Sequence, residues 1–184
     1  MTLSISKATT ADAAALAECA AVTFPLACPP GSLPEDIRQH IETKLSPEQF
    51  EVNITAPGHT ILCLREGSRI LGYSMVVLDQ PADAEVLAAL SHSPVVELSK
   101  FYVHPDQHGR GSAATLMSAT LELATEAGLP GIWLGVNQEN ARALRFYTKS
   151  GFRIVGTKRF RLGTRFEDDY TLEQPLPVGA ETAA

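Results

Sequence analysis

Two glycines at the junction of a predicted strand and a predicted helix constrain this chain more than any other feature. Gly109 and Gly111 follow the β-rich residues 95–103 and open residues 111–127, in which apolar side chains recur at helical spacing. Glycine lacks a Cβ, so the turn can approach a ligand closely, and the amino end of the helix offers unpaired N–H groups and the positive end of its dipole. The sequence therefore predicts a turn that binds an anionic ligand such as a pyrophosphate.

Two familiar phosphate-binding turns fit this spacing poorly. The Gly-Ser-Ala sequence that begins at Gly111 lacks the Gly-Lys-Ser/Thr with which a P-loop grips phosphate and magnesium. The dinucleotide fingerprint G-x-G-x-x-A matches from Gly109 onward, but residues 104–108 separate its glycines from the strand. The acidic residue that this fingerprint places about twenty residues later is also missing. A third kind of turn remains.

Residues 108–113, His-Gly-Arg-Gly-Ser-Ala, resemble the Gln/Arg-x-x-Gly-x-Gly/Ala signature of the GNAT superfamily of acetyl-CoA-dependent N-acyltransferases. The departure is His108, which stands where that family has Gln or Arg. A second family signature is matched by Asn140, by Tyr147 seven residues later and by the Gly-Phe pair that follows. Seven residues are close to two helical turns, so Asn140 and Tyr147 share one helix face. Without the other motif, Asn140 would be interpreted as a helix cap and Tyr147 as a core residue.

The resemblance implies an α/β (α+β) fold, in which a mixed, mostly antiparallel twisted sheet of six to seven strands carries helices on both faces. The chain has 184 residues and no internal repeat or linker, so we expect one N-acetyltransferase domain over residues 1–174 and a flexible tail at residues 175–184. In this family the strands on either side of the turn helix splay apart and admit the pantetheine arm. Here those strands are residues 95–103 and 132–136.

Periodicity and turn residues predict the remaining elements. Helices are expected at residues 9–22, 35–44, 111–127 and 140–151. Strands are expected at residues 60–65, 69–78, 95–103, 132–136, 152–160 and 165–172, with a variable link at residues 79–93.

The resemblance implies acetyl-CoA as the cosubstrate. Amides of the glycine turn would hold its pyrophosphate, and the edge of the preceding strand would pair with its pantetheine amides. The expected cofactor-binding residues are Phe101, Tyr102, Val103, Gly109, Arg110, Gly111, Ser112, Ala113, Ala114 and Asn140.

Acetyl transfer to an amine requires a base, donors for the tetrahedral oxyanion and an acid for the thiolate. The resemblance to the histone acetyltransferase branch implies Glu97 as the base; a solvent-facing Glu97 paired with a neighbouring cation is the alternative. Other members place an acidic residue on the following strand, where this chain has Gly135. Tyr147 is the expected acid, because a phenol of pKa about 10 gives up its proton only to a strongly basic sulfur. Backbone N–H groups near residues 101–103 would stabilise the oxyanion.

The acceptor stays open. In this family the loop at residues 25–34 and the hairpin tip at residues 161–169 build the acceptor pocket. The acidic residues 167–169 would attract a polyamine or a lysine side chain. Alternatively, the carboxylate of an amino acid would be held by Arg159, Arg161 and Arg165, or all of these charges are simply solvated. We expect a small-molecule primary amine, with a protein N-terminus or lysine as the alternative, and a noncatalytic acyl-CoA-binding sensor as a different class.

Cysteines and histidines give no sign of a metal centre. The cysteines are Cys19, Cys28 and Cys63. They form no C-x-x-C pair, which predicts reduced thiols. Cys28 would allow an acyl-cysteine relay, but no base lies next to it in sequence, so direct transfer is expected. His104 and His108 have the spacing of helical zinc ligands, but Pro105 interrupts a helix there and no third ligand is evident, so we expect no metal.

Composition argues against several partners. A net charge of −6 without a basic stripe gives no reason to expect nucleic acid. No apolar run has the length of a bilayer span, and the first residues lack the order of a signal peptide, so we expect a cytoplasmic protein with no membrane partner. The choice between monomer and homodimer stays open.

Overall fold

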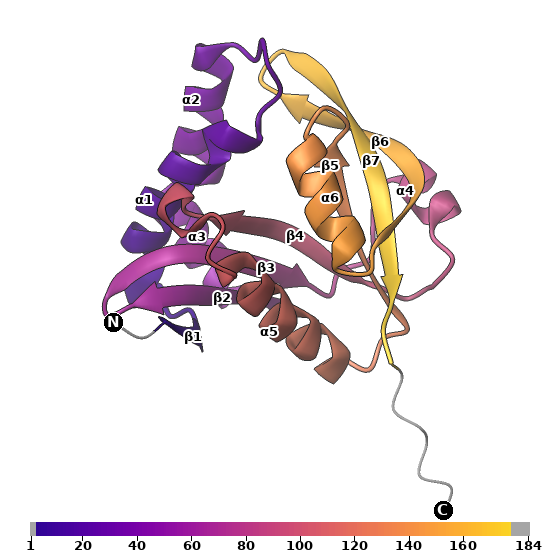
Figure 1. The fold of residues 1–184 in the computed structure, drawn as a ribbon. Helices are drawn as coiled ribbons and strands as arrows, with labels where there is room; N and C mark the ends of the chain where they lie inside the picture. Colours follow the sequence, from indigo (N-terminus) through magenta and orange to yellow (C-terminus); the bar gives the residue numbers. More distant parts are fainter. Residues whose placement is uncertain (1–2, 178–184) are drawn as a thin grey trace, which may run out of the picture.

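The computed structural model describes residues 3–177. Its strands are β1 (Leu3–Lys7), β2 (His59–Glu66), β3 (Arg69–Val77), β4 (Val96–Val103), β5 (Gly131–Asn137), β6 (Arg153–Leu162) and β7 (Arg165–Pro175). Within the described residues these seven strands form one sheet in the order β1-β2-β3-β4-β5-β7-β6 (Figure 1). All neighbours are antiparallel except β4 and β5, which run parallel. The expected mixed, mostly antiparallel sheet is therefore confirmed.

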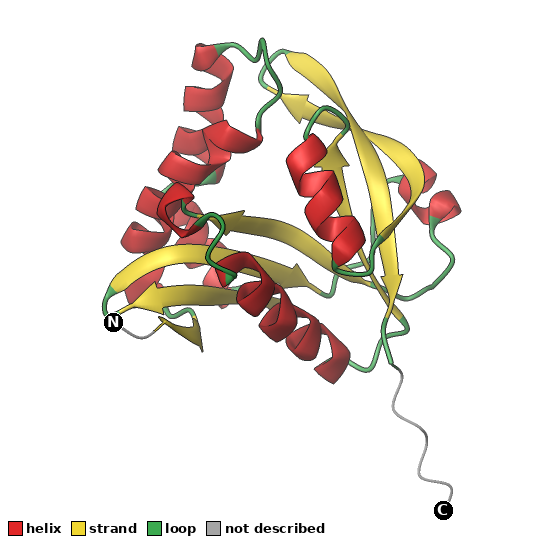
Figure 2. Cartoon of the chain, viewed as in Figure 1, coloured by secondary structure: helices red, strands yellow, loops and turns green. Residues whose placement is uncertain are grey.

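Helices cover both faces of the sheet (Figure 2). They are α1 (Ala13–Thr23), α2 (Pro34–Lys44), α3 (Pro47–Thr55), α4 (Ala84–Ala89), α5 (Ser112–Glu126) and α6 (Ala141–Lys149), with the short 3₁₀ helices η1 (Thr10–Asp12), η2 (Phe24–Ala27) and η3 (Pro105–Gln107). Tyr73 and Met75 of β3 belong to the core beneath α1, α2 and α3, whereas Val76 belongs to the core beneath α5 and α6. A strand buried on both faces is apolar along its length, as β3 is.

The two parallel strands separate soon after they begin. Val96 pairs with Ile132 and Glu97 with Trp133, and no further residue of β4 pairs with β5 in the described chain. Beyond these pairs β4 and β5 diverge, as Figure 1 shows. The sequence analysis expected this separation at residues 95–103 and 132–136, and the structure confirms it.

A β-bulge in β4 decides which side chains face the same way. Met75 pairs with Lys100, but the next residue of β3, Val76, pairs with Leu98, so one residue of β4 is left over between them. Glu97 pairs with Val77, and Tyr102 pairs with Tyr73. Cross-strand partners point to the same face. The bulge therefore brings Glu97, Lys100 and Tyr102 to the face that carries α1, α2 and α3.

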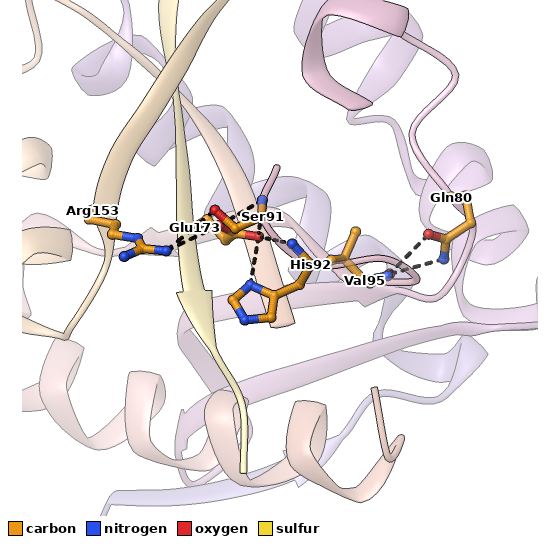
Figure 3. Close-up of polar contacts among 6 residues, drawn as sticks. All are labelled: Gln80, Ser91, His92, Val95, Arg153 and Glu173. Carbon is orange, nitrogen blue, oxygen red and sulfur yellow. Dashed lines mark hydrogen bonds and ion pairs between the residues drawn. The ribbon is translucent and has the colours of Figure 1, made fainter. Parts of the chain in front are cut away.

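A buried carboxylate holds the chain just before β4 (Figure 3). Glu173 of β7 is 0% exposed and accepts hydrogen bonds from the backbone N–H groups of Ser91 and His92 at 3.0 and 2.9 Å. The His92 ring nitrogen Nδ1 lies 2.9 Å from the same carboxylate. Nearby, the Gln80 side chain bonds both the N–H and the C=O of Val95. These contacts fix the start of β4 and so the position of Glu97.

Some elements differ from the sequence-based expectations. The sequence analysis missed β1, α3 and α4; the last lies within the link at residues 79–93. The tail expected from residue 175 was wrong at its start, because Pro175 pairs with Gly131 and the Leu176 N–H donates to the Pro130 carbonyl. The rest of that expected tail, residues 178–184, lies outside the described residues.

Candidate active site

Two cavities meet beside β4 and α6. The larger cavity, of about 560 Å³, lies between η2, α2, β4 and the C-terminal strands, and the turn cavity, of about 370 Å³, lies between the glycine turn and α6. Six residues line both of them: Ala27, Phe101, Tyr102, Asn140, Ala143 and Tyr147. A long molecule seated in the turn cavity can therefore reach a second molecule in the larger one.

The glycine turn requires glycine at two positions. Gly109 and Gly111 have φ angles of 76° and 80°, in the left-handed region that side chains with a Cβ rarely adopt. Gly111 is the N-cap of α5, so the first N–H groups of this helix have no partner within the helix. Both glycines line the turn cavity, together with Ala113 and Ala114. The turn cavity thus contains the dipole end and the free amides that suit an anion.

Two predicted residues of the turn lie differently. The Ser112 side chain is buried and its hydroxyl donates to Gln107 Oε1 at 2.8 Å, so only its backbone N–H is left for a ligand. Arg110 is exposed and lines neither cavity. His108, the departure from the family signature, has its Nε2 3.2 Å from the carbonyl oxygen of Val103. This ring therefore ties the turn to the end of β4.

The free edge of β4 connects the cavities. Phe101, Tyr102 and Val103 line the turn cavity, and the first two also line the larger cavity. Because β5 has already diverged, the backbone groups of this edge that face β5 are left without a strand partner in the described chain. An extended ligand with amide groups can pair with such an edge as an added strand would.

Asn140 and Tyr147 lie at opposite ends of α6 and line both cavities. Asn140 caps the helix, because its Oδ1 accepts from the Ala143 N–H at 3.0 Å; its side-chain NH₂ is not used by the cap. The Tyr147 ring packs edge-on against Phe101 and Phe152, with centroids 6.2 and 5.9 Å apart. Burial raises the pKa of Tyr147 above its ordinary value, so the phenol is protonated at neutral pH.

Glu97 lines the larger cavity and is half-buried. Burial raises the pKa of this carboxyl group, while Lys158 and Lys100 act in the opposite direction. Within residues 3–177 Glu97 forms no ion pair. These facts disfavour the alternative of a solvent-facing glutamate paired with a cation.

Asp169 is a cavity residue that the sequence analysis had assigned to a hairpin tip. The turn between β6 and β7 is much tighter, so residue 169 lies within β7, where it pairs with Lys158 on one side and Asn137 on the other. The side chain is buried and lines the larger cavity. Burial raises the pKa of Asp169 to about 6, although Lys158 lowers it. A carboxyl group of this pKa is suited to exchange protons near neutral pH.

The three arginines proposed to hold a carboxylate do not act together. Arg161 lines the larger cavity. Arg159, by contrast, lies with its guanidinium carbon 5.7 Å from the centre of the Phe166 ring, and Arg165 donates to the Gly31 carbonyl at 3.2 Å. The alternative in which these three arginines together hold a carboxylate is therefore not supported.

Cys28 also lines the larger cavity, where its thiol lies 3.5 Å from the Phe24 carbonyl oxygen. Burial raises the pKa of this thiol to about 11. The thiolate that an acyl-cysteine relay needs is therefore scarce at neutral pH.

Comparison with known proteins identifies the family. Residues 27–152 match the family described as the Acetyltransferase (GNAT) family. The chain is a member of the GNAT family. An uncharacterized N-acetyltransferase of Mycobacterium tuberculosis is 45% identical over 165 residues, which are 90% of this chain and 98% of the relative.

Solved structures share the GNAT fold of this chain. The PaiA N-acetyltransferase of Thermoplasma acidophilum, in complex with coenzyme A, superposes with a TM-score of 0.78 at 20% identity, over 95% of this chain and 99% of that one. YncA of Salmonella typhimurium, solved with its cofactor acetyl-CoA, gives a TM-score of 0.64 at 22% identity, over 100% of this chain and 99% of that one. Both structural similarities support the assignment of the GNAT fold.

Most predicted site residues of this GNAT acetyltransferase come together around the two cavities. Glu97 and Tyr147 line the larger cavity, and Phe101, Tyr102, Val103, Gly109, Gly111, Ala113, Ala114 and Asn140 line the turn cavity. The sequence analysis missed three charged residues that line the larger cavity: Lys44, Lys100 and Lys158. It had named Asp169, but as part of a hairpin tip. No motif marks these lysines in the sequence, and the register that opposes Lys158 to Asp169 is given only by the structure.

Within residues 3–177, no group of three or more His, Cys, Asp or Glu side chains is arranged to hold a metal ion. His104 Nδ1 instead accepts from the Asp106 N–H at 3.3 Å. No helix in the same residues is long and apolar enough to cross a membrane.

Proposed function

We propose that this GNAT acetyltransferase moves an acetyl group from acetyl-CoA to a small-molecule primary amine by direct attack. The observation that carries the proposal is the junction of the two cavities at Phe101, Tyr102 and Tyr147. A cofactor in one cavity and an amine in the other would meet there.

The cofactor would run along the turn cavity. Its pyrophosphate would accept hydrogen bonds from the backbone N–H groups of residues 109–114, supported by the dipole of α5. Its pantetheine amides would pair with the free edge of β4 at Phe101, Tyr102 and Val103. The Asn140 side-chain NH₂ would donate to the same arm, and the thioester would lie at the junction of the cavities.

The chemistry would need three groups. Glu97 would take a proton from the ammonium form of the acceptor, for which a carboxylate with a raised pKa is the better base. The amine would attack the thioester carbonyl, and backbone N–H groups near residues 101–103 would stabilise the oxyanion. As the intermediate collapses, the C–N bond stays and the C–S bond breaks. Tyr147 would then protonate the departing thiolate, and the second proton of the attacking nitrogen would leave through solvent and restore the phenol.

The larger cavity favours a small acceptor over a protein one. Its walls come from η2, α2, β4, β6 and β7, and about 560 Å³ is the volume of a small-molecule site. A protein N-terminus or lysine remains the second candidate, since one extended residue would also enter. A noncatalytic acyl-CoA sensor is the third, and the placement of a protonated phenol beside the edge of β4 speaks against it.

Two measurements test the proposal. Calorimetry should detect heat when acetyl-CoA is added to the pure protein, and thiol release from acetyl-CoA should rise when a pooled set of amines is included. Absence of heat would refute the cofactor site. Binding without amine-dependent thiol release would favour the sensor.

A further inference from the structure

Charged side chains of both signs line the larger cavity. Its cations are Lys44, Lys100, Lys158 and Arg161, and its carboxylates are Glu97, Glu167 and Asp169. Among residues 3–177 none of these seven takes part in an ion pair. Elsewhere the same chain pairs partly buried charges closely, as Arg65 and Asp12 do at 2.9 Å. The lack of close ion pairs is therefore a feature of this cavity and not of the whole described chain.

The Lys158 and Asp169 side chains cover the sheet at Gly135. A Cβ added to Gly135 would lie 3.3 Å from Lys158 Nζ and 3.5 Å from Asp169 Oδ2. The ammonium group also lies 5.3 Å from the centre of the Trp133 ring, a cation–π contact that holds its stem against the sheet. Because residue 135 is glycine, the Lys158 side chain can lie directly over the sheet, which brings its ammonium group and the Asp169 carboxylate to the same part of the larger cavity.

Glu97 and Lys100 form a second such couple on β4. The bulge places both on the same face, yet they make no ion pair in the described chain. Burial lowers the pKa of Lys100, which Glu97 only partly offsets, and burial raises the pKa of Glu97. Poorly solvated charges without close partners are unfavourable, so a ligand that supplies both counter-charges gains affinity.

One wall of the larger cavity is apolar. The His40 ring stacks on Phe24 with centroids 4.4 Å apart and meets the edge of Phe160 at 5.8 Å. Burial lowers the pKa of His40 to about 4, so the ring is neutral at neutral pH. This wall suits an apolar side chain.

We propose that the acceptor is an α-amino acid with an apolar side chain. Its amine faces Glu97 and Asp169, its carboxylate is bound by Lys158 and Lys100, and its side chain lies against the aromatic wall. A polyamine is disfavoured because it carries no negative charge for the four cations that line the cavity beside the three carboxylates. This inference rests on the proposed function, since it names the substrate class of the same site.

The first test compares amino acids with matched amines that lack the carboxylate. Thiol release from acetyl-CoA is measured with L-phenylalanine, L-leucine and L-methionine, each beside its amide. The amino acids should have a kcat/KM roughly tenfold to a hundredfold higher, as expected for loss of a charge-assisted contact. The amides carry the less basic amine and so more free base at neutral pH, which works against this preference. Equal or faster turnover of the amides would overturn the proposal.

Lys158→Met should remove the preference, because methionine keeps most of the side-chain length without the charge. The ratio of kcat/KM between each amino acid and its amide should fall to about one. This ratio is the readout, because Lys158 also lowers the pKa of Glu97 and Asp169 and its removal shifts the rates with both kinds of substrate. Arg159→Met is the matched control: it removes the neighbouring cation, which contacts Phe166 and does not line the cavity. A Lys158→Met enzyme that keeps the full preference would contradict the assigned carboxylate site.

A binding measurement does not depend on turnover. Protein saturated with free coenzyme A is titrated in a calorimeter with N-acetyl-L-phenylalanine and with its amide. Tighter binding of the acid, lost in Lys158→Met, supports the inference, and equal binding overturns it. If coenzyme A itself gives no heat and no amine releases thiol, the proposed function fails first. If amides are acetylated as well as amino acids, only the substrate class fails.

Discussion

Replacing Glu173 by glutamine should test how the start of β4 is held. In the wild type a fully buried carboxylate accepts from the Ser91 and His92 N–H groups and contacts the His92 ring (Figure 3). Hydrogen bonds to a charged group contribute about 1.5–3 kcal/mol each and neutral ones about 0.5–1.5 kcal/mol. Glutamine keeps the shape but loses the charge and turns an NH₂ toward one of these donors. Arg153 adds little, because its side chain is 61% exposed and 3.9 Å away.

We therefore expect Glu173→Gln to lower the free energy of unfolding by about 2–4 kcal/mol at neutral pH. Urea denaturation followed by the fluorescence of Trp133 measures it, since this is the one tryptophan in the sequence and it pairs with Glu173 across the strands. Glu18→Gln, at an exposed position of α1, is the control and should stay within about 0.5 kcal/mol of wild type. A Glu173→Gln protein as stable as this control would refute the reasoning.

The same pair of proteins should show a defined pH dependence. Burial acts to raise the pKa of Glu173, but the hydrogen bonds from His92 and Ser91 outweigh it and hold the pKa below its ordinary value of 4.5. A lowered folded-state pKa means that the stabilisation is present above the unfolded-state pKa and is lost as the pH falls through the folded-state pKa. The gap in stability between wild type and Glu173→Gln should therefore narrow below a pH of about 4.5. If the difference in stability between the two proteins stays constant below this pH, the ionised form of Glu173 is not the source of the stabilisation.

Further substitutions test the site. Tyr147→Phe should reduce kcat at least about tenfold with little change in acetyl-CoA affinity, and unchanged turnover would remove its role as an acid. Glu97→Gln should reduce kcat/KM by a factor that shrinks at high pH, where more of the amine is free base; a loss independent of pH would speak against base catalysis. Gly111→Ala should weaken coenzyme A binding and cost about 1 kcal/mol of stability, whereas Gly128→Ala, at φ 70° and away from both cavities, should show only the second effect. Cys28→Ser should retain most activity in steady-state assays, and its inactivation would revive the acyl-cysteine relay.

Much of the fold could be predicted from local signals in the sequence. The turn before α5 was predictable because Gly109 and Gly111 need positive φ, and the β2–β3 hairpin because its strands are β-rich and flank a short turn. The elements that escaped prediction give weak local signals. β1 has five residues at the edge of the sheet, and α4 has six. Their positions depend on pairing and packing with distant parts of the chain.

The charges of the larger cavity were harder to predict than its motifs. Residues 167–169 looked like a solvated hairpin tip because the sequence does not show where β6 ends. Lys158 and Asp169 are cross-strand partners in the structure, so their side chains lie on the same face of the sheet. That face is covered by η2 and α2, which are far away in sequence. Lys100 carries no motif either. Its place in the cavity depends on a single extra residue in β4.

That extra residue links the proposed base to the proposed substrate site. In a regular strand, residues three apart point to opposite faces, so Glu97 and Lys100 would be separated by the sheet. The bulge adds one residue between Leu98 and Lys100 and restores a common face, on which Tyr102 also lies. The same strand then presents a carboxylate and an ammonium group to the larger cavity and its free edge to the turn cavity. One irregularity in β4 therefore lets a single strand contact both proposed substrates, which spacing along the sequence could not reveal.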